Sequence, residues 1–414
     1  MDKHPQNWFY WLNRNAPAAG IIVTVVIALG SAGWALHTWQ KSNASLDISG
    51  QVSIGGDVTQ VGGDLIITGD PLDQKTIGHL NSLLDRYRAD LDQRDIELAD
   101  KEALIAQLKA TLELAQKIAA GGDDKLASRA RALLADLGSG SLGAALLPNL
   151  RALIQDYEQG PIKDLVQLHM GEGALTYYGD PQAALAAYRR AHALDPENIV
   201  AINSIGLLEL LFGSLKAAED AFRQVLDLGR FQDDQGAMAV GYGNLGNVAF
   251  KQGDLDAAVD YHNQALALDK ELGSKEGMAT QYGNLGNVAE MRGDLDTAVE
   301  YYNQALALDK ELGSKEGMAT QYGNLGNVAF KQGDLDAAVE YYNQALALDK
   351  ELGRKEGMVL GYANLGLVAF KRGDLLEARQ FWVQARGLFA EMGVQPKVAL
   401  IDESLADLEP PAEP

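Results

Sequence analysis

Asparagine recurs in the C-terminal half of the sequence at a spacing that suits hydrogen bonding to an extended polypeptide. Two asparagines stand three residues apart in the phrase YGNLGNVA, so they share one face of a helix. Each side-chain amide offers two donors and an acceptor, which are the groups needed to pair with the N–H and C=O groups of a peptide backbone. The candidate binding residues are Asn244, Asn247, Asn284, Asn287, Asn324, Asn327 and Asn364.

A second row of candidates follows the asparagines. Lys251, Lys331 and Lys371 each come directly after a phenylalanine, and Glu290-Met291 interrupts the row in the remaining copy. Such a row would add apolar and cationic contacts to a bound ligand. The alternative for the asparagines is structural, because their amides would also serve to cap or bridge neighbouring copies of the phrase.

Catalytic and metal-binding chemistry is not indicated by the sequence. The chain has no cysteine, and its six histidines are scattered without metal-ligand spacing. GYGNLG at 241–246 and GSGSLG at 138–143 match G-x-G-x-x-G, but neither lies between a strand and a helix, as dinucleotide binding requires. The carboxylates follow the repeat, as solvated helix faces do. We therefore expect no enzyme, no cofactor and no metal.

Composition and charge narrow the possible partners. The 414 residues are 47% hydrophobic and 22% charged, which is typical of globular protein. The formal net charge is −22 and no basic cluster interrupts the acidic pattern, so a nucleic acid would be repelled. The length leaves room for two or three domains or for one elongated repeat array.

The asparagine phrase belongs to a forty-residue repeat. Residues 276–315 and 316–355 are identical at 35 of 40 positions, a third copy starts at residue 236, and a diverged copy starts at 356. Two shorter units precede them at 163–196 and 197–230. In the copy from residue 236, we expect a helix over about 237–251, a glycine at its end and a second helix from Leu255. Self-similarity at this period predicts a solenoid.

The repeat resembles the tetratricopeptide repeat (TPR), in the form with forty residues that kinesin light chains contain. The resemblance lies in the order of Tyr242, Leu245-Gly246, Ala249, Ala258, His262 and Ala265 and covers six repeats over 163–396. It implies an all-α superhelical solenoid, with the asparagine positions on its concave face and a peptide or helix of a partner protein in the groove. His262 stands where other copies have tyrosine, so we expect it to pack. Residues 397–414 are expected to form a capping helix and a disordered tail.

The N-terminal residues 1–41 predict a single transmembrane helix. Residues 17–36 carry no charge and are long enough to cross a bilayer, with Trp11 before them and Trp34 and Trp39 at their far end. The alternative is a cleaved signal peptide, because small residues follow the apolar run. Basic residues favour the amino terminus inside by one charge, which predicts a bacterial inner-membrane protein with a periplasmic array.

Two further segments lie between this helix and the repeats. Residues 46–70 hold short β-favouring runs separated by Gly-Gly-Asp turns, which predicts three or four strands; the alternative is a turn-rich linker. Residues 72–120 place apolar side chains every seven residues, which predicts a coiled-coil stalk; the alternative is an amphipathic helix folded onto its own chain. A homo-oligomer through 46–120 follows from the first interpretation. Residues 121–162 are expected to be a helical linker.

These observations favour a membrane-anchored scaffold whose concave groove holds part of another protein, with residues 17–36 in the lipid bilayer. Two alternatives stay open. One is a structural spacer that assembles with itself. The other is the sensor arm of a bacterial signalling or defence system, which rests on the glycine-aspartate strands alone.

Overall fold

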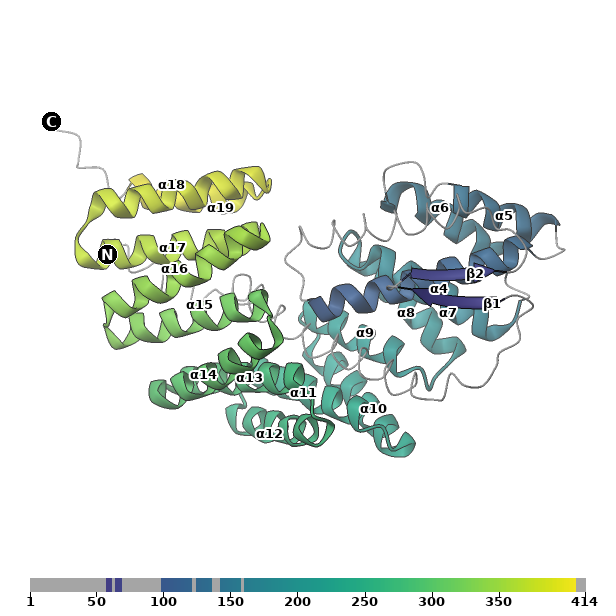
Figure 1. The fold of residues 1–414 in the computed structure, drawn as a ribbon, viewed down its shortest axis with the longest axis horizontal. Helices are drawn as coiled ribbons and strands as arrows, with labels where there is room; N and C mark the ends of the chain where they lie inside the picture. The colour runs from purple at the N-terminus through teal and green to yellow at the C-terminus, as the bar shows by residue number, and fades with distance from the viewer. Residues whose placement is uncertain are drawn as a thin grey trace.

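The computed structural model describes residues 57–61, 64–68, 98–120, 124–135, 142–157 and 160–406, which are almost entirely helical. Successive helices stack side by side in a curved array (Figure 1). The helices are α4 (Leu98–Ala120), α5 (Asp124–Ala135), α6 (Leu142–Asp156), α7 (Ile162–Thr176), α8 (Pro181–Leu194), α9 (Ile199–Leu211), α10 (Leu215–Gln232), α11 (Gln235–Gln252), α12 (Leu255–Leu272), α13 (Lys275–Arg292), α14 (Leu295–Leu312), α15 (Lys315–Gln332), α16 (Leu335–Leu352), α17 (Lys355–Arg372), α18 (Leu375–Glu391) and α19 (Gln395–Ala406).

Two strands precede the helices. Strand β1 (Asp57–Val61) pairs antiparallel with β2 (Asp64–Thr68), so that Asp57 lies opposite Thr68. The sequence predicts three or four strands over residues 46–70, and the remainder of that segment lies outside the described residues.

Six helix pairs, from α7–α8 to α17–α18, correspond to the six predicted repeats. The first helix of each pair is called helix A below and the second helix B. Local sequence sets their ends: Asp294 caps α14 by accepting from the N–H of Thr297, and Gly293 ends α13 with a φ of 80°. A left-handed residue at this place suits glycine, which has no Cβ to clash. Because these signals recur every forty residues, α11, α13, α15 and α17 begin forty residues apart.

Within each pair the helices approach closely at a glycine of helix A. A Cβ at Gly286 would lie 2.5 Å from Cε1 of Tyr302, and one at Gly326 would lie 2.6 Å from Cε1 of Tyr342. His262 fills the same place over Gly246 and is 1% exposed, which confirms that it packs. Its burial lowers the pKa of His262 to about 4, so the ring is neutral near pH 7.

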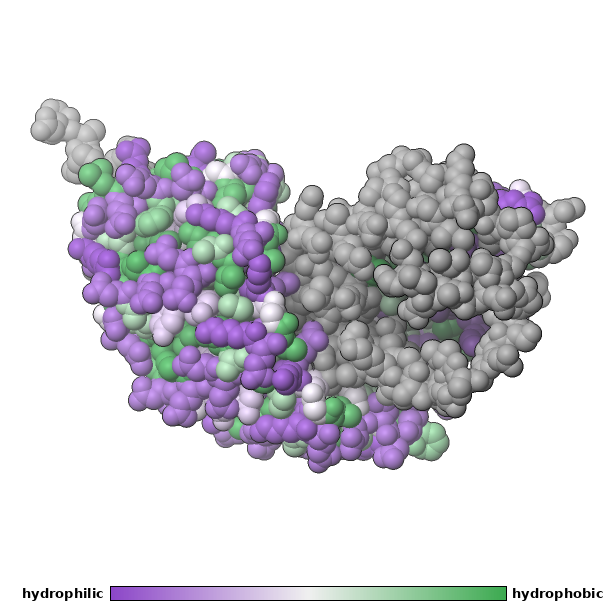
Figure 2. Space-filling view, in the orientation of Figure 1, coloured by the Kyte–Doolittle hydropathy of each residue, from purple (hydrophilic) through white to green (hydrophobic). Residues whose placement is uncertain are grey.

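Consecutive repeats are joined by contacts that return with the same period. The ammonium group of Lys310 lies 5.6 Å from the ring centre of Tyr322, and that of Lys350 lies 5.1 Å from the ring centre of Tyr362. Arg292 of α13 also pairs with Asp256 of α12 in the preceding repeat. On the face that Figure 2 shows, the C-terminal repeats present mainly hydrophilic side chains, with small hydrophobic areas between them.

The predicted coiled coil of residues 72–120 is wrong over its described part, residues 98–120. Helix α4 packs against α5 and α7 of the same chain. Its heptad residues Leu108 and Leu112 are each 1% exposed, and they belong to the core that the first repeats share. Because the heptad seam of residues 98–120 is buried in its own chain, it does not pair there with a second copy as a coiled coil. The alternative of an amphipathic helix folded onto its own chain describes it.

The structure describes the C-terminal part of the chain up to residue 406 but not the N-terminal residues 1–56. None of the described helices combines the length and apolar composition that crossing a bilayer requires, and the predicted transmembrane segment, residues 17–36, lies outside them. Helix α19 follows the last repeat, and its Ile401 is 3% exposed in a cluster with Trp382. It covers the last helix pair, as expected of a capping helix.

Candidate functional site

Helices A line the inner side of the curved array. Helix α11 touches both α9 and α13, and α15 touches α17, whereas no two helices B among the described residues make as extensive a contact. A stack whose A helices are closer together than its B helices bends toward the A side, as the curve in Figure 1 shows. The side chains on this side are therefore the ones that a ligand held in the curve would meet.

The inner wall is hollowed between α13 and α15. The hollow, called the amide pocket below, has a volume of about 270 Å³. Three of the predicted binding residues, Asn284, Asn287 and Asn324, line it. Its other polar lining residues are Glu276 and Thr280 from α13, Glu316, Thr320 and Gln321 from α15, and Asp309 and Ser314 before α15.

The amide pocket contains buried polar atoms that the protein itself does not satisfy. Asn284 is 2% exposed, and its Nδ2 has no hydrogen-bond partner within the protein. On the facing helix, Gln321 is 7% exposed and its Oε1 also has no partner. A buried polar group without a partner costs about 1–3 kcal/mol. One unsatisfied donor and one unsatisfied acceptor on side chains that line the same pocket match the two groups of a peptide bond.

Other predicted asparagines make contacts between repeats. Asn244 is fully buried, and its Nδ2 donates to Oδ1 of Asn203 in the preceding helix A at 2.9 Å. Asn364 donates in the same way to Asn327, at 3.5 Å. Asn247 is 3% exposed, and its Nδ2 has no partner in the protein. Asn244 therefore bridges neighbouring repeats, which is the structural alternative to ligand binding.

The asparagines at the second position also bind within their own repeat. The hydroxyl of Tyr302 has two acceptors for its one proton, Oδ1 of Asn287 at 2.8 Å and Oε2 of Glu290 at 2.7 Å. The hydroxyl of Tyr342 donates to Oδ1 of Asn327 at 2.9 Å. At Asn327 this bond fixes the amide so that its oxygen points to helix B. The amide nitrogen then points away from helix B.

The three lysines lie in different surroundings. Lys331 pairs with Glu290 of the preceding repeat at 2.7 Å, which explains why a glutamate interrupts the phenylalanine row. Lys371 lies over the ring of Phe330, 4.4 Å from its centre. Lys251 is half-buried, and this burial lowers the pKa of its ammonium group. Lys331 and Lys371 thus join consecutive repeats.

The prediction that the carboxylates lie on solvated faces is wrong at one place in each of the third, fourth and fifth repeats. Asp269, Asp309 and Asp349 are 0%, 6% and 4% exposed. Burial raises the pKa of Asp269 and of Asp309 to about 7; Gln281 and Gln321 oppose the rise in part, and Glu276 adds to it at Asp309. Each carboxyl packs on a glycine of the next helix A, where a Cβ on Gly317 would lie 2.3 Å from Oδ1 of Asp309.

The comparisons with known proteins agree with this repeat geometry. The family model "MalT-like TPR region" matches residues 232–404, and a tetratricopeptide-repeat model matches residues 175–233. No curated protein matches the chain significantly.

Solved structures are similar at low sequence identity. BtubC (BKLC) from P. vanneervenii is 22% identical over 59% of this chain and 92% of its own, with a TM-score of 0.43. A Rap protein complexed with competence and sporulation factor is 14% identical over 81% of this chain and 98% of its own, with a TM-score of 0.49. A tetratricopeptide repeat protein from Parabacteroides merdae is 15% identical over 67% of this chain and 99% of its own, with a TM-score of 0.47.

TM-scores below 0.5 say nothing about what this chain binds, so the assignment depends on the family models and on the geometry. The two matched ranges overlap at residues 232–233. Helix pairs continue over that range, and from Gly206 onward a glycine of each helix A packs under the aromatic or histidine of its helix B. Glycines in the left-handed conformation end most of the later helices. Residues 175–404 are therefore tetratricopeptide repeats, and over this range the chain belongs to that class of all-α solenoid.

Proposed function

We propose that the chain is a membrane-anchored, non-enzymatic scaffold that holds an extended segment of another protein along the inner wall of its repeats. The observation that carries the proposal is the amide pocket, where Nδ2 of Asn284 and Oε1 of Gln321 are buried without partners. An extended peptide supplies one N–H and one C=O per residue, whatever its side chains. Asn287 and Asn324 line the same pocket and add further amide groups.

The similarity of the two pocket walls suits a ligand that the protein recognises by its backbone groups. The pocket walls α13 and α15 differ at only three positions, residues 290–292 against 330–332. A groove lined by such similar helices offers the same contacts to each part of a bound peptide. We infer that the ligand is recognised by its extended conformation more than by one particular sequence.

Removing the pocket amides is expected to weaken peptide binding. The triple variant Asn284→Ala, Asn287→Ala, Asn324→Ala should lose at least tenfold in affinity, because each hydrogen bond contributes about 0.5–1.5 kcal/mol. The probes are peptides selected on the full chain from a library of random ten-residue sequences, and calorimetry measures their affinity. The matched control is Asn303→Ala with Asn343→Ala on helices B, where these exposed side chains donate only to carbonyls of their own helices.

Circular dichroism separates binding from folding in this experiment. The triple variant also removes the bond from Tyr302 to Asn287, so a small decrease in melting temperature is expected. A folded triple variant that binds the selected peptides as tightly as the wild type would exclude the amide pocket as their site. A control variant that loses binding equally would do the same.

The anchor is proposed from the uncharged residues 17–36, and the periplasmic side from the basic residues Lys3 and Arg14 before them. The full chain is expected to stay in the membrane pellet after an alkaline wash, and a variant without residues 17–36 is expected to leave it. Added protease should then cleave the array in spheroplasts but not in intact cells. A full chain that washes off the membrane contradicts the anchor, and an array protected in spheroplasts contradicts the periplasmic side.

A further inference from the structure

The first repeat differs from the others at two buried positions. In every repeat, one glycine of helix A packs under the aromatic or histidine of helix B, and in the first repeat this is Gly173 under Tyr188. The residue before that glycine is Glu172, and the residue four places before it is His169. In the other repeats the place of Glu172 holds an apolar residue: Ile205, Leu245, Leu285, Leu325 or Leu365. The place of His169 holds Ile202, Tyr242, Tyr282, Tyr322 or Tyr362.

Glu172 is held by a cluster of cationic and polar side chains. The Glu172 side chain is only 4% exposed; its Oε1 accepts from Nε of Arg151 at 2.7 Å, and its Oε2 lies 3.4 Å from Nη1 of Arg190. Nδ1 of His169 is 3.5 Å from the same oxygen. Burial by itself would raise the pKa of Glu172, but His169 and Arg151 outweigh it, so the pKa is lowered and the group is ionised.

Stability does not explain this cluster. An apolar residue at the place of Glu172 packs well in five repeats of the same chain. Replacing a buried ion pair by well-packed apolar residues is commonly neutral or stabilising in proteins. A charged cluster at a place where leucine suffices suggests a role other than folding.

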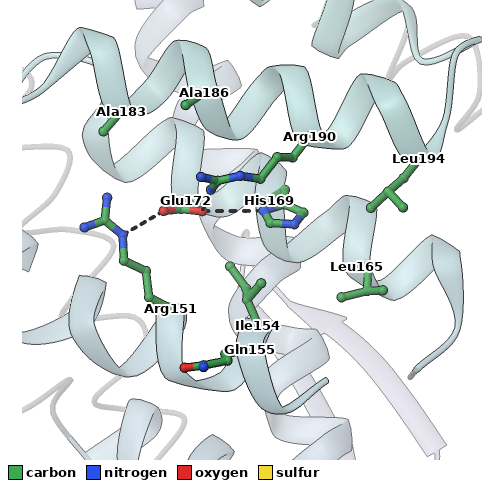
Figure 3. A pocket seen from close by; sticks show the side chains of 10 residues that line it. All are labelled: Arg151, Ile154, Gln155, Leu165, His169, Glu172, Ala183, Ala186, Arg190 and Leu194. Atoms are coloured by element: carbon green, nitrogen blue, oxygen red, sulfur yellow. Dashed lines mark hydrogen bonds and ion pairs between the residues drawn. The ribbon is translucent and has the colours of Figure 1, made fainter. Parts of the chain in front are cut away.

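The cluster forms one end of a pocket between α6, α7 and α8 with a volume of about 650 Å³, within the range of about 300–1,000 Å³ that small-molecule sites occupy. Figure 3 shows Arg151 and Arg190 reaching from α6 and α8 toward Glu172, while Ile154, Leu165 and Leu194 lie toward the other end. The arginine side chains are 49% and 57% exposed.

The charges of this pocket differ from those of the whole chain. Glu172 is the only carboxylate among the described lining residues, and two arginines face it. Arg151, Arg190 and Glu172 therefore give the pocket a net formal charge of +1, in a chain whose net formal charge is −22. Because Glu172 fixes one side of each guanidinium group, the remaining N–H donors are preorganised for a second anion.

We propose that this pocket binds a carboxylate carried on a short apolar group, with the carboxylate on Arg151 and Arg190 and the apolar group against Ile154, Leu165 and Leu194. A free short-chain acid and the C-terminus of a polypeptide ending in an apolar residue present the same chemistry. The site is separate from the amide pocket, so it does not depend on the proposed scaffold function.

Calorimetry on the full chain, kept in a neutral detergent, tests the proposal with two carboxylate probes. These are hexanoate and an acetylated tripeptide that ends in leucine, and their neutral controls are hexanol and the amidated tripeptide. At least one carboxylate is expected to bind, and its neutral control at least tenfold more weakly. Tighter binding of the tripeptide assigns the site to a polypeptide C-terminus, and tighter binding of hexanoate assigns it to a free acid.

Two variants and a matched control connect binding to the pocket. Arg190→Gln is expected to weaken binding of the carboxylate at least tenfold, and Ala186→Trp is expected to abolish it by filling the pocket. Arg189→Gln is the control, because Arg189 precedes Arg190 on α8 but pairs with Glu209 outside the pocket. Circular dichroism confirms that each variant is folded. The proposal fails if neither carboxylate binds, if hexanol binds like hexanoate, or if a folded Ala186→Trp variant binds like the wild type.

Discussion

Replacing Gly326 by alanine is expected to destabilise the array, and replacing Gly323 by alanine in the same helix is expected to stabilise it. A Cβ at Gly326 would lie 2.6 Å from Cε1 and 2.7 Å from Cδ1 of Tyr342, which has no room to move because it is 3% exposed. Overpacking of this kind costs about 1–3 kcal/mol. A Cβ at Gly323 meets nothing within 4 Å, so alanine there gains about 0.5–1 kcal/mol of helix propensity.

Thermal unfolding of the full chain, followed by circular dichroism, measures both effects. Repeat arrays need not unfold in one step, so hydrogen exchange of α15 and α16 is the local measurement. The double variant Gly326→Ala, Tyr342→Leu should recover part of the loss, because the smaller side chain leaves space for the new methyl group. Two glycine variants that change stability in the same direction would contradict this account of the helix contact.

Replacing Asp309 by asparagine is expected to stabilise the protein at pH 8 and to have little effect at pH 4. Burial, with a smaller contribution from Glu276, raises the pKa of Asp309 to about 7 in the folded chain, from 3.8 in an unperturbed one. Between these values the unfolded state has lost the proton and the folded state still holds it. The contribution of Asp309 to the free energy of unfolding therefore falls as the pH rises from about 4 to about 7 and is level above that.

The size of the effect follows from the pKa difference. Each pKa unit corresponds to about 1.36 kcal/mol, so one carboxyl with this shift accounts for up to about 4 kcal/mol. The asparagine variant has no such group, and its advantage over the wild type should grow through this pH window. Urea unfolding of both proteins at pH 4, 5.5, 7 and 8 measures the difference. A constant difference across the series would show that Asp309 does not titrate in this way.

The repeats were predictable because their signals are local and recur. Gly253 and Gly293 end helices, Asp254 and Asp294 begin them, and Gly246 permits a close contact; each of these roles can be inferred from residues within one repeat. The resulting expectation of a helix over about 237–251 agrees with the observed helix Gln235–Gln252.

The surroundings of α4 and of Asp309 were not predictable in the same way. A heptad such as Ile105, Leu108 and Leu112 has the same spacing whether it packs on another copy or on its own chain, so spacing did not reveal that α4 packs on α7. Asp309 follows three apolar or small positions within a helix that also carries exposed charges, and only the next repeat buries it. In both cases the burial depends on a contact between two helices that are separate in the sequence, and residue spacing within one helix does not show such a contact.

The candidate site was partly predictable. Helical spacing placed Asn284 and Asn287 on one face, and the structure brings both to the amide pocket with Asn324. Spacing did not show that Asn244 would find Asn203, because residue 203 lies in a shorter unit that lacks the phrase. Thr280 and Glu276 are four and eight residues before Asn284 on the same helix face, a signal that would have added them to the prediction.

The repeated boundary between helices B and A has a genetic consequence. Residues Gly273–Glu276 and Gly313–Glu316 both read GSKE, so removal of residues 276–315 joins Lys275 to Glu316 without altering the local sequence. Helix α12 would then meet α15 across the kind of boundary it now shares with α13. A whole forty-residue unit can therefore be added or removed at this boundary, which changes the length of the array without creating a new junction.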